Sequence, residues 1–293
     1  MALSPFFFGV TARVKAVFAG RVGPPLVQPY FDIVKLFRKK CVYSRTTTWV
    51  FRASPVVVLA AVMAFSLTVP FGEIRAPLGF PGDILLAAYL LALARFFMIA
   101  AAMDTGSSME GLGASREAFF SCFSELALFM NFIALASCSG NISLSRMIGE
   151  EMPLSGGTLT PALILVVSSF FILLLAENCR IPVDDPDTHL ELTMIHEVMV
   201  LDHSGIDLAY LLVAQTAKLF VFSAIVVQMI VPGAAGDRAV GIGIYLAGMM
   251  FVSILIGVVE SCMARLRLDR VKYLLLISFG LAFFGFIVSL WRK

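Results

Sequence analysis

Residues 176–205 read AENCRIPVDDPDTHLELTMIHEVMVLDHSG, and this stretch separates two apolar runs that are each long enough to cross a membrane. It contains ten acidic or histidine side chains, although only 14% of the whole chain is charged and 59% is hydrophobic. Titratable groups next to membrane-length apolar runs carry a high desolvation cost. Such a concentration of them therefore indicates a functional segment between two transmembrane helices.

The apolar runs predict an all-α fold, a polytopic transmembrane helical bundle. The chain has 293 residues and a mean hydropathy of +0.93. Only helices and closed barrels satisfy their backbone groups in lipid, and barrel strands alternate over about ten residues. The runs here are longer and unbroken, so we expect helical spans near residues 54–71, 83–102, 118–138, 160–178, 207–231, 239–262 and 271–290.

Residues 1–20 predict a short or truncated first span. Only twelve residues precede Arg13, and they reach roughly 18 Å, against a hydrocarbon core of about 30 Å. We therefore interpret Ala2–Ala12 as the end of a first helix that is either short or begins upstream of Met1. With this helix the bundle has about eight spans, and we expect residues 1–293 to form a single transmembrane domain.

Residues 21–52 predict a basic amphipathic connector. Apolar side chains near helical spacing alternate with a basic group at Lys35, Arg38, Lys39 and Lys40, a pattern typical of helices that lie at the membrane interface. Such a helix either binds lipid headgroups only or also supports a docked partner. The candidate docking residues are Arg21, Gln28, Tyr30, Asp32 and Lys35.

The distribution of basic residues predicts the orientation in the membrane. Fifteen of the 22 lysines and arginines fall on the side of the basic connector, five fall on the other side, and two lie inside predicted spans. Because basic residues concentrate on the cytoplasmic side of inner-membrane proteins, we expect the connector and the acidic stretch 176–205 to be cytoplasmic. The small net charge of +2 gives no indication of nucleic-acid binding.

Several charged residues lie in the predicted spans, namely Arg95, Glu125, Lys218 and Glu260, and Glu177 ends one of them. Two interpretations are open. The charges form neutralising pairs that fix helix packing, or the carboxylates form a line that passes protons. Glu260 is two residues from the end of its span, so we expect it to reach the interface.

The polar segments give further structural predictions. Residues 104–117 are predicted to form a Gly-rich loop before a helix that starts at Ser115, with Gly111 and Gly113 allowing close backbone approach. Residues 188–191 form a capping box, so we expect a helix from there to about Leu201. The histidines of this stretch recur every seven residues, about 10.5 Å along a helix, which is too far for a shared metal ion.

No residue of the chain is predicted to be catalytic, to bind a cofactor or to hold a metal. The five cysteines, Cys41, Cys122, Cys138, Cys179 and Cys262, show no metal-ligand spacing. Because the spacing of its histidines excludes a shared metal ion, the acidic stretch 176–205 is predicted to form a hydrated charged funnel.

Four ordered motifs carry a resemblance to a known family: RVGPPLVQPYFDIVKLFRK at 21–39, MDTGSSMEGLGASREAFFSCFSEL at 103–126, the stretch at 176–205, and ESCMARLRLDRVKYLL at 260–275. The chain resembles the membrane-anchor subunit shared by respiratory complex I and the membrane-bound group 4 nickel–iron hydrogenases. The sequence DDPDTHLELTMIHE is similar to the corresponding segment in the hydrogenase branch of the family, which includes formate hydrogenlyase and hydrogenase-4.

The resemblance implies about eight transmembrane helices with a cytoplasmic amphipathic helix after the first. It also implies a chain of ion-coupling carboxylates at Glu125, Glu177, Asp184, Asp185, Glu191 and Glu197. The resemblance implies Arg116 and Arg180 as their counter-charges. We add Lys218, the lysine inside the predicted span 207–231, to these counter-charges.

The resemblance also implies a place in a complex. The expected protein is a non-redox subunit of an energy-converting hydrogenase in the cell inner membrane, coupling electron transfer to proton or sodium translocation. Its partners are hydrogenase large and small subunits, an iron–sulfur protein and antiporter-like membrane subunits, and the nickel–iron centre and iron–sulfur clusters lie in those partner subunits. Three alternatives remain: a complex I subunit that lines the quinone chamber, a purely structural membrane anchor, and a free-standing transporter.

Overall fold

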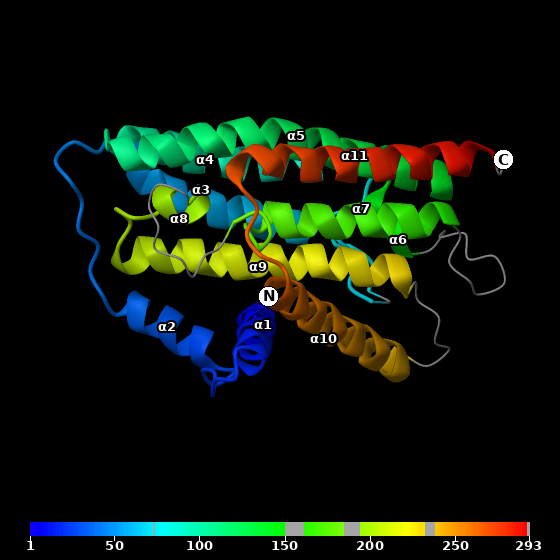
Figure 1. The fold of residues 1–293 in the computed structure, drawn as a ribbon, viewed down its shortest axis with the longest axis horizontal. Helices are drawn as coiled ribbons and strands as arrows, with labels where there is room; N and C mark the ends of the chain where they lie inside the picture. Colours follow the sequence, from blue (N-terminus) through cyan, green and yellow to red (C-terminus); the bar gives the residue numbers. More distant parts are fainter. Residues whose placement is uncertain (73, 150–160, 185–193, 232–237, 292–293) are drawn as a thin grey trace.

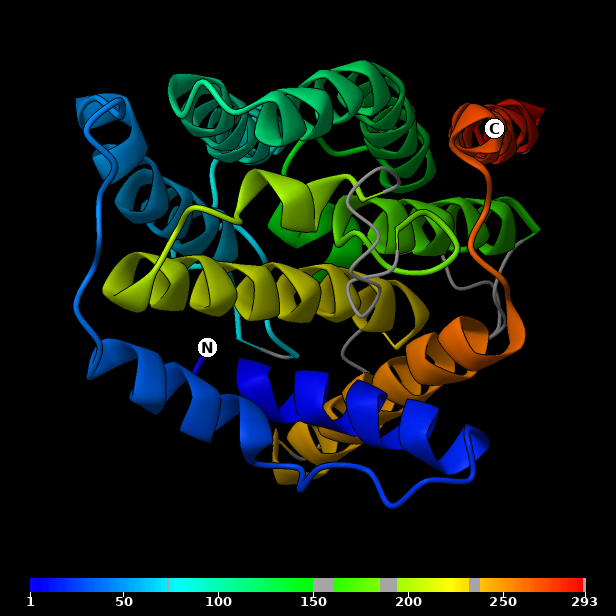
Figure 2. The same ribbon diagram turned by 60° about the vertical axis from the view of Figure 1, so that its left-hand side comes forward.

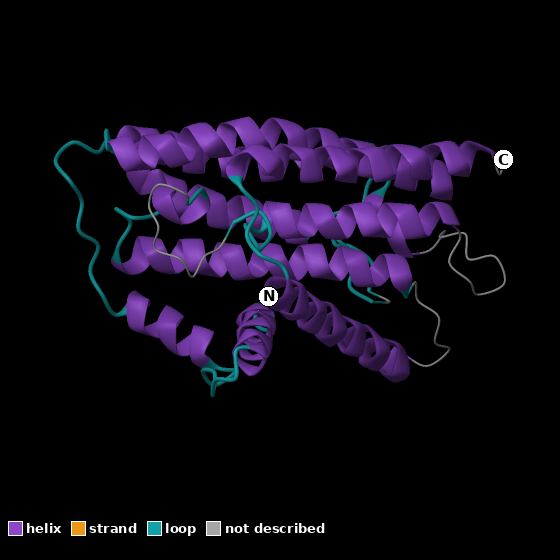
Figure 3. Cartoon of the chain, viewed as in Figure 1, coloured by secondary structure: helices purple, strands orange, loops and turns teal. Residues whose placement is uncertain are grey.

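The structure, a computed structural model, describes residues 1–72, 74–149, 161–184, 194–231 and 238–291. In this part of the chain all regular elements are helices (Figure 3). Their bounds are α1 Ser4–Phe18, α2 Gln28–Phe37, α3 Trp49–Ser66, α4 Asp83–Asp104, α5 Ser108–Ser139, α6 Leu144–Gly149, α7 Pro161–Glu177, α8 His196–Met199, α9 Gly205–Ile230, α10 Arg238–Cys262 and α11 Leu268–Trp291.

The long helices form a bundle around α9. Six helices of the described chain are long and apolar enough to cross a membrane, namely α3, α4, α5, α9, α10 and α11, and α7 is a shorter apolar helix. Figure 1 shows α3, α4, α5, α7, α9 and α11 running side by side, with α10 inclined to them. The predicted transmembrane helical bundle is therefore confirmed.

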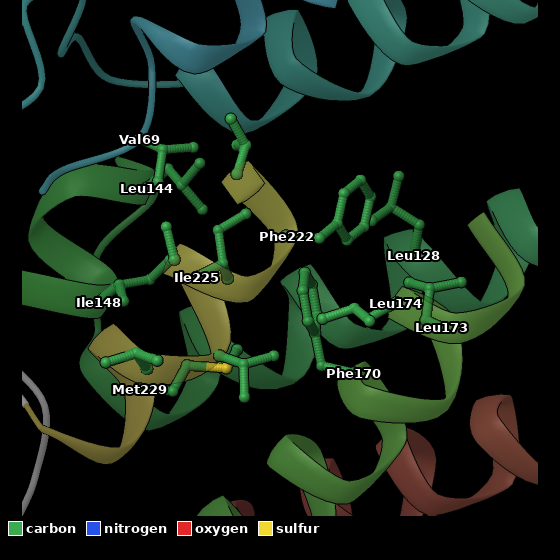
Figure 4. Packing of buried hydrophobic residues seen from close by; sticks show 14 of the residues in the cluster. Val69, Leu128, Leu144, Ile148, Phe170, Leu173, Leu174, Phe222, Ile225 and Met229 are labelled. Carbon is green, nitrogen blue, oxygen red and sulfur yellow. The ribbon is translucent and has the colours of Figure 1, made fainter. Parts of the chain in front are cut away.

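The core of the bundle lies where α5, α6, α7 and α9 meet. Figure 4 shows Phe222 and Ile225 of α9 among Phe170 and Leu173 of α7 and Leu128 of α5. The Phe170 and Phe222 rings stack with centroids 5.7 Å apart. The aromatic and branched side chains leave α9 buried on most of its surface, which fixes the helix that later supplies Lys218.

The first helix lies within residues 1–20, where a short first span is predicted, but it ends later than expected. α1 ends at Phe18, not near Ala12, and lies at a steep angle to the bundle (Figures 1 and 2). Two basic residues remain helical because each meets an acceptor: Arg13 donates to the Gly23 carbonyl, and Lys15 pairs with Glu260.

The amphipathic helix predicted after the first helix is confirmed as α2. None of its residues is buried, and its exposed side chains include Phe31, Val34 and Phe37. It is tied to the bundle by the Tyr30 hydroxyl, which donates to the Ala2 carbonyl at 2.6 Å, and by the edge-on contact of the Phe37 and Tyr210 rings.

The predicted loop over residues 104–117 is wrong in extent, because α5 begins at Ser108 rather than at Ser115. Ser107 has extended backbone geometry, as N-cap residues do, and Glu110 lies in the first turn. Gly113 lies in the helix and packs against α8, where a Cβ atom would meet Ile195, Val198 and Met199 at 3.0 Å. The expected close approach is therefore confirmed for Gly113, whereas Gly111 has open space around it.

The helix predicted from the capping box falls partly outside the described residues. Residues 188–191 are not described, and the part that is described contains one helical turn, α8, which ends at Met199. Asp184 holds the start of α8, because its Oδ2 accepts from the backbone N–H groups of Ile195 and His196 at 3.0 and 3.1 Å.

Candidate ion-coupling site

Arg95 is the centre of a buried charge cluster. It lies 12 residues after the start of the 22-residue helix α4 and nine before its end, which is about 18 and 14 Å and so close to the middle of this candidate membrane span. Three carboxylates surround its guanidinium: Glu177 at 2.6 Å, Glu125 at 2.8 Å and Glu117 at 3.6 Å. One cation therefore joins α4 to both α5 and α7.

Lys218 supplies a second cation from α9. Its Nζ atom lies 2.9 Å from Oε2 of Glu177 and also donates to the Glu177 carbonyl at 2.6 Å, which caps the end of α7. Glu177 therefore has Arg95 on one carboxylate oxygen and Lys218 on the other, and its side chain is only 2% exposed. We name Arg95, Glu117, Glu125, Glu177 and Lys218 the hub; with all members ionised its net charge is −1.

Two small cavities border the hub. One has a volume of about 60 Å³, and its polar lining includes Arg95, Glu177, Gln215 and Lys218. The other has a volume of about 20 Å³ and reaches Asp184. Since roughly 10–15 Å³ admits a water molecule in a polar site, both are large enough for water. Glu117, Glu177 and Cys179 line both cavities, so Glu177 borders the cavity that Lys218 lines as well as the one that Asp184 lines.

The turn after α7, residues 178–184, carries a second set of ion pairs. Arg180 lies 3.3 Å from Glu260 of α10, whose other oxygen lies 3.4 Å from Lys15 of α1. Asp184 pairs with Arg265 at 2.8 Å. Cys179, between Glu177 and Arg180, has a positive φ of 50°, and burial raises the pKa of its thiol.

The structure brings together some of the predicted site residues. Glu125, Glu177 and Lys218 meet in the hub, and Asp184 lies at the adjoining cavity. Glu197 is on α8, half-buried. Asp185 and Glu191 lie outside the described residues.

Of the predicted counter-charges, Lys218 meets a predicted carboxylate, because it pairs with Glu177 at 2.9 Å. Arg180 pairs with Glu260, not with a predicted carboxylate, because the turn directs its side chain toward α10 and α1. Arg116 donates to the Met194 carbonyl at 2.9 Å and so ties α5 to the segment before α8. The expectation that Glu260 reaches the interface is wrong, because its side chain is 0% exposed between Arg180 and Lys15.

The predicted docking residues lie on α2 or just before it. Arg21, Asp32 and Lys35 are exposed. The amide of Gln28 donates to Asp32 at 3.0 Å, one helical turn away. Gln28 and Tyr30 therefore stabilise the helix and its attachment, while the three exposed residues remain available to a partner.

Sequence reasoning did not name Glu117 or Lys15 as members of the clusters, and it named Arg95 and Glu260 only as charges within predicted spans. A signal for Glu117 was present, because it lies eight residues before Glu125 and hence on the same face of a continuous helix. The pairing of Lys15 with Glu260 joins residues 245 positions apart in the chain, and nothing in the local sequence indicates it.

Two of the three histidines, His196 and His203, lie within the described residues. His203 stacks on Phe51 with ring centroids 4.0 Å apart, and burial lowers its pKa to about 4. Within the described ranges, no group of three or more His, Cys, Asp or Glu side chains is arranged to hold a metal ion.

Comparison with known proteins identifies the family. The family model described as NADH dehydrogenase matches residues 1–290. The chain belongs to this family. It is 29% identical to formate hydrogenlyase subunit 4 of Escherichia coli (strain K12), over 98% of this chain and 94% of that protein. It is 28% identical to hydrogenase-4 component C of the same organism, over 96% and 90%.

Complex I relatives share a shorter region. A membrane subunit of the NADH-quinone oxidoreductase of Rubrobacter xylanophilus is 30% identical over 73% of this chain and 64% of that protein. A chain in the structure of the membrane-bound sulfane sulfur reductase, an archaeal respiratory membrane complex, has the same fold, with a TM-score of 0.83, 20% identity and coverage of 98% and 94%. The chain is thus a membrane protein related to subunits of hydrogenase and NADH-quinone oxidoreductase complexes.

Proposed function

We propose that the chain is a non-redox membrane subunit of an energy-converting nickel–iron hydrogenase of the formate hydrogenlyase type. In this function it anchors the peripheral redox arm and couples electron transfer to proton or sodium translocation. The observation that carries the proposal is the hub, a buried cluster of charged side chains between candidate membrane spans, with two water-sized cavities that Glu177 borders.

The choice of the hydrogenase branch rests on coverage. The two hydrogenase-type relatives match this chain over 98% and 96% of its length, whereas the Rubrobacter complex I relative matches 73%. In such a complex the nickel–iron centre and the iron–sulfur clusters lie in the large, small and iron–sulfur partner subunits, and this chain contributes charge and shape but no redox group.

The mechanism is electrostatic. A redox change in the docked arm alters the field at the acidic segment, and Asp184 and Glu177 respond because they border the same cavity. Arg95 and Lys218 hold Glu177 from two sides, so a shift of either cation changes its affinity for an ion. Asp185, Glu191 and Glu197 are proposed to continue the path toward the redox arm, on the cytoplasmic side that the basic residues favour.

Glu125 gives the path an exit toward a partner subunit. Its side chain is 42% exposed, although it contacts Arg95 near the middle of α4. Because lipid offers a carboxylate no hydrogen-bond donor, we assign this surface to an antiporter-like membrane subunit. Cys122 is exposed one helical turn before Glu125, so a cross-linker placed on its thiol in the intact complex is expected to capture a membrane subunit.

The assignment to the hydrogenase branch is tested on the complex that co-purifies with this chain from native membranes. The expected preparation contains nickel, evolves hydrogen and retains iron–sulfur subunits. A preparation that lacks nickel and reduces quinone favours the complex I alternative instead. A chain that is isolated without any partner contradicts both assignments and favours a free-standing transporter.

If the chain is a purely structural anchor, a variant that neutralises a hub residue should give a different result from the one expected for ion coupling. In that case Glu177→Gln affects assembly alone, and the assembled fraction translocates ions normally. Asp83→Asn is a matched control, because Asp83 is a buried carboxylate bonded to the N–H of Leu144 and the hydroxyl of Ser143, far along the chain from Glu177.

A further inference from the structure

The corner between α10 and α11 holds the turn after α7 at three places. We name residues 260–266 the corner segment and residues 178–184 the turn segment. Glu260 pairs with Arg180 at 3.3 Å, and Arg265 pairs with Asp184 at 2.8 Å. Between them, the Leu266 N–H donates to the Pro182 carbonyl at 2.9 Å. The segment that follows Glu177 is therefore fixed from outside α7.

Glu260 and Arg180 form a buried pair within this set. The Glu260 side chain is 0% exposed, and the Arg180 side chain is 5% exposed. The Arg180 guanidinium also lies 4.4 Å above the centre of the Phe8 ring, while its Nε and Nη2 atoms have no hydrogen-bond partner within the described chain. Among described residues, Glu260 is thus the anion that holds Arg180, and a buried guanidinium that loses its anion is strongly disfavoured where it stands.

The position of Arg180 determines the end of α7. Its N–H donates to the Leu175 carbonyl at 2.9 Å, and its own carbonyl accepts from Val183 at 2.8 Å. Cys179 beside it has left-handed backbone geometry, which non-glycine residues keep only when the surrounding contacts hold them. If Arg180 moves, the strained turn has a route to relax, and Glu177, three residues earlier, moves with it.

We propose that Glu260 is a positioning residue for the ion-coupling site. By holding Arg180, it keeps the turn segment in the geometry that places Glu177 between Arg95 and Lys218. The claim about geometry stands on the contacts above, and its consequence for ion translocation rests on the proposed function. Lys15 is secondary, because the Arg180–Glu260 pair stays neutral without it.

A cysteine within the turn segment, Cys179, can report on the conformation of that segment. Cys179 lines both cavities, and burial keeps its thiol protonated and slow to react. The experiment uses the intact complex in native membranes, with the other four cysteines replaced by serine, and measures the rate at which a small maleimide labels Cys179. Glu260→Ala is expected to raise this rate by about tenfold or more, since labelling follows local opening.

Two variants control this measurement. Asp269→Asn removes a carboxylate just beyond the corner segment that forms an exposed pair with Arg267 at 3.4 Å, and it should leave the labelling rate unchanged. Lys15→Gln should change the rate by less than about twofold, because the buried pair of Arg180 and Glu260 remains intact and neutral without Lys15. A large increase in either control contradicts the role assigned to Glu260.

A conservative variant covers the case in which Glu260→Ala does not assemble. Glu260→Asp retains the charge but shortens the reach to Arg180, and it should give an intermediate labelling rate and an intermediate ratio of ions to electrons. Unchanged labelling in the assembled Glu260 variants overturns the positioning role, whatever the ratio. Faster labelling with an unchanged ratio supports the positioning role and counts against the ion-coupling function, so the two proposals fail separately.

Discussion

Replacing Arg95 with methionine removes the one cation that three carboxylates share. Glu177 and Glu125 lie 2.6 and 2.8 Å from its guanidinium, and Glu117 lies 3.6 Å away. Methionine fills much of the volume but leaves Glu177 with Lys218 alone. Removing one partner of a buried ion pair costs about 3–5 kcal/mol, and the arginine side chain is only 7% exposed. We therefore expect Arg95→Met to lower the free energy of unfolding by this amount.

A double-mutant cycle tests the reasoning behind this magnitude. The assay is reversible unfolding of the purified full chain in mixed detergent micelles, for Arg95→Met, Glu177→Gln and the double variant. Because the double variant leaves no unpaired charge between these two positions, it should be less destabilised than the sum of the single variants, by about 2 kcal/mol. Arg267→Met, in an exposed pair with Asp269, should cost no more than about 1 kcal/mol.

The reasoning is refuted if the coupling energy in this cycle is below about 0.5 kcal/mol, the size expected for independent sites. Such a result means that Arg95 and Glu177 do not interact as an ionised pair in the folded protein. The proposed mechanism, in which Arg95 changes the affinity of the Glu177 carboxylate for an ion, then has no basis.

Three further predictions concern residues outside the hub. Burial lowers the pKa of His203 to about 4 from its ordinary 6.5, so the stability that its neutral ring provides is fully present above pH 6.5 and is lost as pH falls toward 4. The free energy of unfolding should therefore decrease with falling pH in this range, and His203→Phe, which keeps the stack on Phe51, should remove that dependence. Ser278→Ala should cost about 0.6 kcal/mol in detergent unfolding, because its hydroxyl bonds the Ser169 carbonyl at 2.9 Å between α11 and α7. Gly205→Ala should lower the unfolding free energy by about 1–3 kcal/mol, because its φ is +56° and a Cβ atom would lie 2.5 Å from the Lys40 carbonyl oxygen.

The sequence predicted the bundle because lipid leaves few solutions. Unbroken apolar runs of about twenty residues must be helical in lipid, and the predicted spans overlap α3, α4, α5, α7, α9, α10 and α11. Errors fall at the ends of helices, where polar residues on a helix are hard to distinguish from a loop. The start of α5 is the largest, since two glycines within its first turns imitate a loop while Gly113 serves a close contact with α8.

The candidate site was predictable in composition but not in pairing. Charges inside apolar runs pointed to Glu125, Glu177 and Lys218, and the cost of isolated charges in lipid required that they find partners. The partner of each charge is set by which helices pack together, and these helices can be far apart in the sequence. Arg95 and Glu177 are 82 residues apart and Lys15 and Glu260 are 245 apart, and a pattern within one helix carries no information on such contacts.

The proposed exit at Glu125 and the proposed positioning role of Glu260 meet at one residue. Glu125 shares the Arg95 guanidinium with Glu177, and Glu260 holds the turn that follows Glu177. A change on either side therefore acts on the Glu177 carboxylate, which makes this residue the most informative one to neutralise.

The most direct test of ion coupling is the number of ions translocated per electron pair by the complex that carries Glu177→Gln. The complex is reconstituted in sealed liposomes, and hydrogen evolution is measured together with proton and sodium movement. The account predicts that the variant assembles, that its ratio of ions to electrons falls well below that of the wild-type complex, and that Asp83→Asn keeps the wild-type ratio. A Glu177→Gln complex with the wild-type ratio and turnover contradicts the account.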